Sequence, residues 1–143
     1  MIGYLDTSAF VPLLVAEPSS PACRRFWDSA DAVVTCRLLY VEAAAALAQA
    51  ERMERLDGRQ HRRARDLLDG FWAEFDVIEI DELLARAAAD AAHALGLRGY
   101  DAVHFAAAEH LADADLVAAA GDKRLLTAWY GRGLSTYDTN QDG

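Results

Sequence analysis

Short apolar runs alternate with longer segments of helical periodicity along this chain of 143 residues. The runs have the length of buried strands, and turn residues or helix starts bound them. Strands that alternate with helices form a parallel sheet, because each crossover helix packs back on one of its faces. The sequence therefore predicts an α/β fold, a three-layer sandwich with a central parallel sheet of four to five strands and helices on both faces. The predicted strands are residues 2–5, 32–35, 77–80, 116–120 and 134–137.

Helix boundaries follow from cap residues, glycines and prolines. Ser20-Pro21 is a cap followed by proline at the first helical position, and Gly58 and Gly96 mark helix ends. The chain has no repeat, low-complexity tract or linker, so we expect one domain at residues 1–137 and a loose polar tail at residues 138–143. The predicted helices cover approximately residues 8–16, 21–29, 38–55, 59–75, 82–95, 101–111 and 122–130.

The net charge of −9 argues against a protein that binds nucleic acid by broad neutralisation of phosphates. Acids gathered around a metal ion are different, because the bound cation makes their site attractive to phosphate. A metal-dependent nuclease therefore remains compatible with this charge. Most of the clustered arginines and lysines are expected on solvated helix faces.

Cys23 and Cys36 lie in apolar contexts without CxxC spacing, which predicts two small buried thiols in a reducing cytoplasm. No apolar run has the length of a membrane span, and Met1 leads directly into the first predicted strand. We therefore expect a cytoplasmic protein that does not interact with a membrane.

Four acids that are far apart in the sequence are predicted to meet at one edge of the sheet. Asp6 and Asp122 each follow a strand, so both lie at its carboxyl-terminal edge. Glu42 falls in the first or second turn of the helix that leaves this edge after the second strand. Asp101 begins the helix that descends into the fourth strand, so it starts at the same edge.

Each acid also has a purely structural interpretation. Asp6, Asp101 and Asp122 stand where helix caps stand, although capping and metal binding can use different oxygens. Glu42 could lie on a helix edge and reach water, but its apolar helix offers no Lys or Arg three or four positions later, which favours a functional role. His104, one turn after Asp101, could reach the site or be a packed helix residue.

Electrostatic repulsion predicts what such a cluster requires. Two carboxylates about 5 Å apart repel by roughly 3 kcal/mol at an effective dielectric constant near 20, whereas a helix N-terminus offsets only about 0.3–1 kcal/mol. We therefore expect one or more raised pKa values in the absence of a cation. Oxygen ligands favour Mg²⁺ or Mn²⁺, with Ca²⁺ possible on ligand type alone, and the lack of a Cys/His ligand set argues against Zn²⁺.

The sequence resembles the PIN domain family, in detail the VapC-type toxins of bacterial toxin–antitoxin pairs. The resemblance covers essentially the whole chain. It is carried by Leu5-Asp6-Thr7-Ser8, Tyr40-Val41-Glu42-Ala43, Arg98-Gly99-Tyr100-Asp101-Ala102-Val103-His104 and Gly121-Asp122-Lys123-Arg124-Leu125.

This resemblance implies a Mg²⁺- or Mn²⁺-dependent endoribonuclease. Its catalytic acids are expected to be Asp6, Glu42, Asp101 and Asp122, with Thr7 or Ser8 assisting. Members of the family usually form homodimers, and a small antitoxin protein inhibits them. Two departures, Ala120 in place of a common Ser or Thr and Lys123-Arg124 in place of a further acid, concern a second metal ion and leave the first unaffected.

In the expected mechanism, Asp6 and Asp101 hold one cation, and Glu42 and Asp122 act directly or through water. Lys123, Arg124 and the Arg59–Arg65 face are candidates for positioning the RNA backbone. The alternative is a catalytically inactive PIN-fold module that binds RNA or protein. Haloacid-dehalogenase phosphatases fit less well because Ser8 replaces their second Asp, and response-regulator receivers fit less well because Asp6 has no acidic neighbour.

Overall fold

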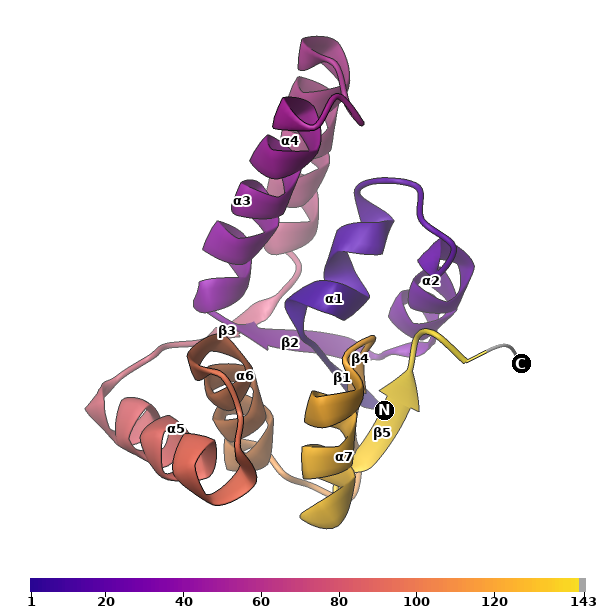
Figure 1. Cartoon of the computed structure of the whole chain (residues 1–143). Coiled ribbons are helices and arrows are strands. Elements are labelled where there is room, and N and C mark those ends of the chain that lie inside the picture. The colour runs from indigo at the N-terminus through magenta and orange to yellow at the C-terminus, as the bar shows by residue number, and fades with distance from the viewer. Residues whose placement is uncertain (142–143) are drawn as a thin grey trace.

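The computed structural model describes residues 1–141 and contains one five-stranded parallel sheet in the order β3-β2-β1-β4-β5 (Figure 1). Tyr4 on the central strand pairs with Val34 on one side and Ala118 on the other. The predicted sheet is confirmed, with strand ends shifted by up to two residues. The strands are β1 (Ile2–Leu5), β2 (Ala32–Cys36), β3 (Asp76–Ile78), β4 (Leu116–Ala120) and β5 (Ser135–Asp138).

The predicted helices are present with altered ends. The expected helix over residues 8–16 is instead α1 (Thr7–Phe10) followed by the 3-10 helix η1 (Val11–Leu13), because Pro12 lacks the N–H that an α-helix needs. The helix expected to reach residue 55 ends at Arg52, since Glu54 has a positive φ of 60°. The other helices are α2 (Ser20–Ser29), α3 (Leu38–Arg52), α4 (Gly58–Trp72), α5 (Glu82–Leu95), α6 (Gly99–His110) and α7 (Lys123–Gly131).

The two faces of the sheet are covered by different helices, which confirms the three-layer sandwich. Tyr4 and Val34 pack in one buried cluster with residues of α5, α6 and α7. Their neighbours Leu5 and Val33 pack in a second cluster with α1 to α4. This separation follows from the alternation of side chains along a strand. Figure 1 shows α1 to α4 on one side of the sheet and α5 to α7 on the other.

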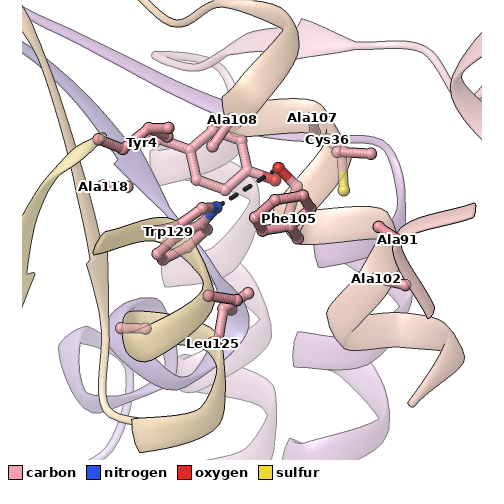
Figure 2. Close-up of a cluster of buried hydrophobic side chains, with 14 of the residues drawn as sticks. Tyr4, Cys36, Ala91, Ala102, Phe105, Ala107, Ala108, Ala118, Leu125 and Trp129 are labelled. Carbon is pink, nitrogen blue, oxygen red and sulfur yellow. Dashed lines mark hydrogen bonds between the residues drawn. The ribbon is translucent and has the colours of Figure 1, made fainter. Parts of the chain in front are cut away.

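Tyr4 is held in the core by its neighbours (Figure 2). Its ring meets that of Trp129 edge to face, with the centroids 5.9 Å apart, and Trp129 Nε1 donates to the Phe105 carbonyl at 3.4 Å. All three side chains are fully buried. The Tyr4 ring therefore has a fixed position, with its hydroxyl group directed toward α6 and His104.

The segment expected as a loose tail begins inside the fold. Asp138 ends β5, and the Thr139 N–H donates to the Ala120 carbonyl at 3.1 Å. Asn140 Nδ2 donates to the Gly121 carbonyl at 2.9 Å. A loose tail was predicted because the polar residues at the end of a docked strand cannot be distinguished, by sequence, from those of a free terminus. Asp142 and Gly143 of the expected tail lie outside the described residues.

The two cysteines are free and buried, as predicted. Within residues 1–141, no helix combines the length and the apolar character needed to cross a membrane.

Candidate active site

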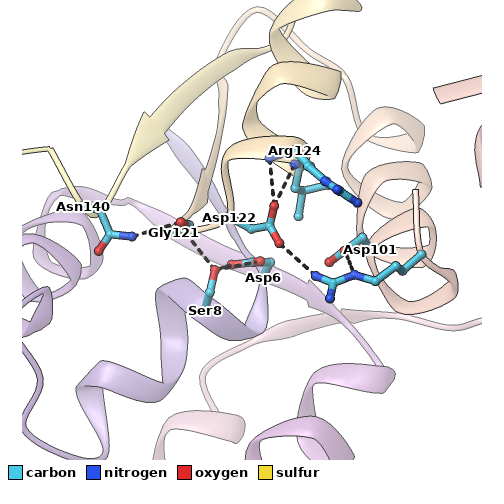
Figure 3. Close-up of polar contacts among 9 residues, drawn as sticks. Asp6, Ser8, Asp101, Gly121, Asp122, Arg124 and Asn140 are labelled. Atoms are coloured by element: carbon cyan, nitrogen blue, oxygen red, sulfur yellow. Dashed lines mark hydrogen bonds and ion pairs between the residues drawn. The ribbon is translucent and has the colours of Figure 1, made fainter. Parts of the chain in front are cut away.

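A cleft of about 410 Å³ opens at the carboxyl-terminal edge of the sheet, and all four predicted acids line it. Asp6 follows β1, and Asp122 follows β4. Glu42 lies in the second turn of α3, and Asp101 in the first turn of α6. Figure 3 shows Asp6, Asp101 and Asp122 gathered there. The topology that the sequence predicted therefore brings these carboxyl groups together.

Cavity size alone would not identify this site. A larger groove of about 630 Å³ lies between η1, α3 and α4, but its lining is mostly aliphatic and includes none of the four acids. We identify the smaller cleft as the candidate site because groups that can ligate a cation converge there.

Asp6 is buried and held by two donors. Its carboxylate accepts hydrogen bonds from Ser8 Oγ at 2.7 and 2.9 Å and from the Ala9 N–H at 3.0 Å, so it also caps α1. Burial raises the pKa of Asp6, and the nearby charge of Glu42 adds to this increase. The charge of His104 and the hydrogen bonds from Ser8 and Ala9 act in the opposite direction, and the resulting pKa is about 6. The raised pKa was expected from repulsion between acids, but desolvation is the larger cause.

Ser8 connects the ends of two neighbouring strands. Its hydroxyl donates to Asp6 and accepts the Gly121 N–H at 2.7 Å. Gly121 is closely surrounded, because a Cβ at this position would lie 3.0 Å from Asn140 Nδ2 and 3.1 Å from Thr139 Oγ1. The docked C-terminal segment therefore closes one side of the cleft.

Glu42 is paired with a buried histidine that the sequence left undecided. His104 Nε2 lies 2.7 Å from Glu42 Oε1, and Thr7 Oγ1 donates to the same oxygen at 2.7 Å. On the other side of the imidazole, Nδ1 lies 2.8 Å from Tyr4 Oη and 3.7 Å from Cys36 Sγ. His104 is only 2% exposed, so it is a packed residue that also reaches the site.

The surroundings of His104 favour its charged form. Burial alone would lower its pKa, but the contacts with Cys36 and Glu42 and the charge of Asp6 raise it to about 10. Of these contacts, the one with the Glu42 carboxylate has the geometry of a charge-assisted hydrogen bond. A charged imidazole donates to Glu42 and orients that carboxylate from inside the protein.

Arg98 bridges the two remaining acids, a contact that the sequence analysis missed. Its Nε donates to Asp101 Oδ2 at 3.2 Å, and its Nη2 donates to Asp122 Oδ2 at 3.3 Å. Asp122 also accepts the backbone N–H groups of Arg124 and Leu125, which caps α7. The only sequence signal for the bridge was an arginine three residues before Asp101 in the quoted motif.

The pKa of Asp101 is raised as well. Its burial is the main cause, repulsion from Asp122 adds to it, and Arg98 opposes it. The expectation of raised pKa values in the cluster is thus met at Asp6 and Asp101.

The donor set suits a hard divalent cation, because the cleft offers carboxylate and hydroxyl oxygens. Several of these oxygens already contact protein groups, namely both oxygens of Asp6 and of Asp122, Oδ2 of Asp101 and Oε1 of Glu42. Over residues 1–141, no three acidic, imidazole or thiol groups already have an arrangement that would bind a metal ion. A cation that used Asp101 Oδ2 as a ligand would have to displace Arg98 from that oxygen.

Lys123 and Arg124 directly follow Asp122 but lie beside the acidic cleft. They are exposed and line a hollow of about 480 Å³ between the end of α5 and α7, together with Thr127 and Arg132. The arginines of the Arg59–Arg65 face belong to α4, and none of them lines the acidic cleft.

The chain matches the PIN domain family model over residues 3–128. It is 39% identical over 130 residues to Ribonuclease VapC45 of Mycobacterium tuberculosis (strain CDC 1551 / Oshkosh), which covers 91% of this chain and 90% of that relative.

The fold is similar to solved structures. A toxin–antitoxin complex from Klebsiella pneumoniae superposes with a TM-score of 0.66 at 14% identity, covering 98% of this chain and 99% of that one. Mycobacterium tuberculosis VapC20, described as a sarcin-ricin loop cleaving toxin, superposes with a TM-score of 0.68 at 19% identity, covering 88% and 94%. The family match over most of the sequence, the relative at 39% identity and the shared fold together show that this chain belongs to the PIN domain family.

Proposed function

We propose that this chain is an endoribonuclease that depends on Mg²⁺ or Mn²⁺ and acts as the toxin of a type II toxin–antitoxin pair. The observation that carries the proposal is the convergence of Asp6, Glu42, Asp101 and Asp122 from four separate elements in one cleft. Its similarity to a named ribonuclease over nearly its full length supports the reaction class.

In the proposed mechanism, Asp6 and Asp101 hold the cation, and Glu42 and Asp122 contribute directly or through water. The bound ion would supply an activated water and polarise the phosphoryl oxygen. Ser8 fixes the Asp6 carboxylate, and Thr7 with His104 fixes that of Glu42. These bonds hold both carboxylates in place before substrate arrives, which lowers the cost of organising the site.

Lys123 and Arg124 are proposed to position the RNA backbone beside the cleft. Both are exposed on the first turn of α7, directly after Asp122. Their charges would attract phosphates locally although the net charge of the chain is −9.

A ribonuclease assay tests the proposal. Asp6→Asn, or EDTA added to the wild type, should reduce cleavage at least about a hundredfold, because loss of a ligand costs no less than loss of an outer-shell partner. Asp90→Asn, which neutralises an exposed acid on α5, is the matched control and should cleave like the wild type. Cleavage that survives both Asp6→Asn and EDTA would refute the proposal.

A catalytically inactive PIN-fold module that binds RNA or protein is the second candidate. It is favoured by the lack of a preassembled ligand set within residues 1–141. Thermal unfolding with Mn²⁺ separates the two, because a ligand that binds only the native state at about 100 times its Kd adds roughly 2.7 kcal/mol of stability. An inactive module predicts no rise in Tm.

We further propose that the protein acts in the cytoplasm, forms a homodimer and is inhibited by a small antitoxin. The likeness to a toxin–antitoxin complex supports this assignment of the partner. Light scattering measures the oligomeric state. Growth arrest on expression, relieved by Asp6→Asn or by co-expression of a small neighbouring gene, tests the toxin role.

A further inference from the structure

We propose that Arg98 has two working positions: it bridges Asp101 and Asp122 before the metal ion binds, and it then moves onto a phosphate of the RNA. This inference rests on the proposed nuclease function and adds a residue that competes with the metal ion and later holds the substrate.

The first position follows from the contacts. Arg98 stands at the N-cap of α6, in extended conformation, three residues before Asp101. Through Nε and Nη2 its guanidinium reaches one oxygen of each acid, Asp101 Oδ2 and Asp122 Oδ2. In Figure 3 dashed lines reach the carboxylates of both Asp101 and Asp122. A cation that used either of these Oδ2 atoms as a ligand would compete with Arg98 for it.

The contacts of Arg98 with Asp101 and Asp122 are weak enough to be exchanged for others. The two N–O distances, 3.2 and 3.3 Å, exceed the 2.7–2.9 Å typical of strong charge-assisted bonds. The Arg98 side chain is 55% exposed, so it can rotate into solvent without unpacking the core. Its Cζ lies 4.8 Å from the centroid of the Tyr100 ring, which also lines the cleft and keeps the guanidinium at its mouth.

Electrostatic repulsion predicts that the Arg98 guanidinium weakens the binding of a cation at the site. A positive charge about 5 Å from a divalent ion at a water-exposed site weakens its binding on the order of tenfold. Once displaced, the guanidinium retains its planar set of five N–H donors, which matches a phosphate. Metal binding and substrate binding are then coupled through one side chain.

The test measures metal and RNA separately. Mn²⁺ affinity is determined by electron paramagnetic resonance of the free ion, with no RNA present. KM is determined with a fluorogenic oligoribonucleotide of mixed sequence. Arg98→Ala should bind Mn²⁺ about tenfold more tightly than the wild type and show a KM raised about tenfold. Arg98→Lys keeps the charge but not the planar donors, so its Mn²⁺ affinity should stay near the wild-type value while its KM rises.

Arg86→Ala is the matched control, because Arg86 pairs with Glu82 on the exposed side of α5. Arg86→Ala should change neither the Mn²⁺ affinity nor the KM. Unchanged or weaker Mn²⁺ binding by Arg98→Ala, with normal binding by the wild type, would overturn the inference and leave the nuclease proposal intact. Tighter Mn²⁺ binding with an unchanged KM would overturn the proposed contact of Arg98 with an RNA phosphate. Failure of both proteins to bind Mn²⁺ would overturn the inference together with the proposed function.

Discussion

The imidazole of His104 lies 2.7 Å from the carboxylate of Glu42, although 62 residues separate them in the chain. Glu42 reaches the cleft, with its side chain 21% exposed, whereas that of His104 is 2% exposed. The hydrogen bond between His104 and Glu42 therefore links a side chain of the protein core to a carboxylate in the cleft. Since Tyr4 contacts the opposite ring nitrogen and is packed against Trp129, the orientation of Glu42 depends on the core of the protein.

Replacement of His104 by Ala should lower RNA cleavage by about 10- to 100-fold, the usual cost of losing a partner that orients a ligand. Tyr4→Phe removes only the hydroxyl group and leaves His104 Nδ1 with the longer contact to Cys36 Sγ alone. It should reduce stability by about 1–3 kcal/mol and cleavage less than His104→Ala does. Initial rates and urea unfolding measure these effects. Tyr130→Phe, at a residue that is 76% exposed, is the control, and a wild-type rate for His104→Ala would refute the orienting role.

The buried Asp6 predicts how stability depends on pH when no metal is bound. Its pKa is about 6 in the folded protein, above the ordinary value of 3.8, so the native state binds more protons than the unfolded state between these values. The free energy of unfolding should therefore fall as pH rises from 4 to 6. Two pKa units correspond to a loss of about 3 kcal/mol by pH 7.

Asp6→Asn removes this titration. In EDTA, the free energy of unfolding of the variant minus that of the wild type should rise between pH 4 and 7, whereas the difference for Asp90→Asn should stay flat. Chemical denaturation at several pH values measures both. A difference for Asp6→Asn that does not change with pH would contradict a buried, ionisable Asp6.

Lys123→Ala and Arg124→Ala test the positioning of the RNA backbone. Each should weaken RNA binding similarly for all sequences and reduce the salt slope of log K by about 1, because one phosphate contact is lost. Arg86→Ala should leave the slope unchanged. Fluorescence anisotropy over a range of salt concentrations is the measurement, and slopes equal to the wild type would place the RNA path elsewhere.

The sequence predicts the fold well because local signals and topology agree. Apolar runs predicted the first four strands, whereas the fifth, Ser135–Asp138, is mostly polar. Right-handed crossovers then bring Asp6, Glu42, Asp101 and Asp122 to one edge of the sheet. Neither step requires knowledge of a side-chain conformation. The misplaced helix ends were set by single residues such as Pro12 and Glu54, whose effects are local.

The side-chain contacts within the site could not be predicted from the sequence. Arg98 could have extended into solvent, and His104 could have packed without touching Glu42, since each side chain has several rotamers. Which rotamer forms depends on groups from other elements, such as Asp122 for Arg98 and Tyr4 for His104. These partners become visible only in three dimensions.

The close approach at Gly121 predicts a large effect for a small substitution. In Gly121→Ala the new methyl group would lie 3.0 Å from Asn140 Nδ2 and 3.1 Å from Thr139 Oγ1, so the docked C-terminal segment must shift. Overpacking of this kind costs about 1–3 kcal/mol. Because the Gly121 N–H also donates to Ser8, which holds Asp6, cleavage of RNA should fall as well.

Gly70→Ala makes the same chemical change inside α4, where a Cβ meets nothing within 4 Å. There alanine should stabilise the protein by about 0.5–1 kcal/mol, because glycine is the poorer helix former. Urea unfolding of both variants should give shifts of opposite sign. If Gly121→Ala were as stable and as active as the wild type, residues 139 and 140 would not be held against the active-site edge in solution.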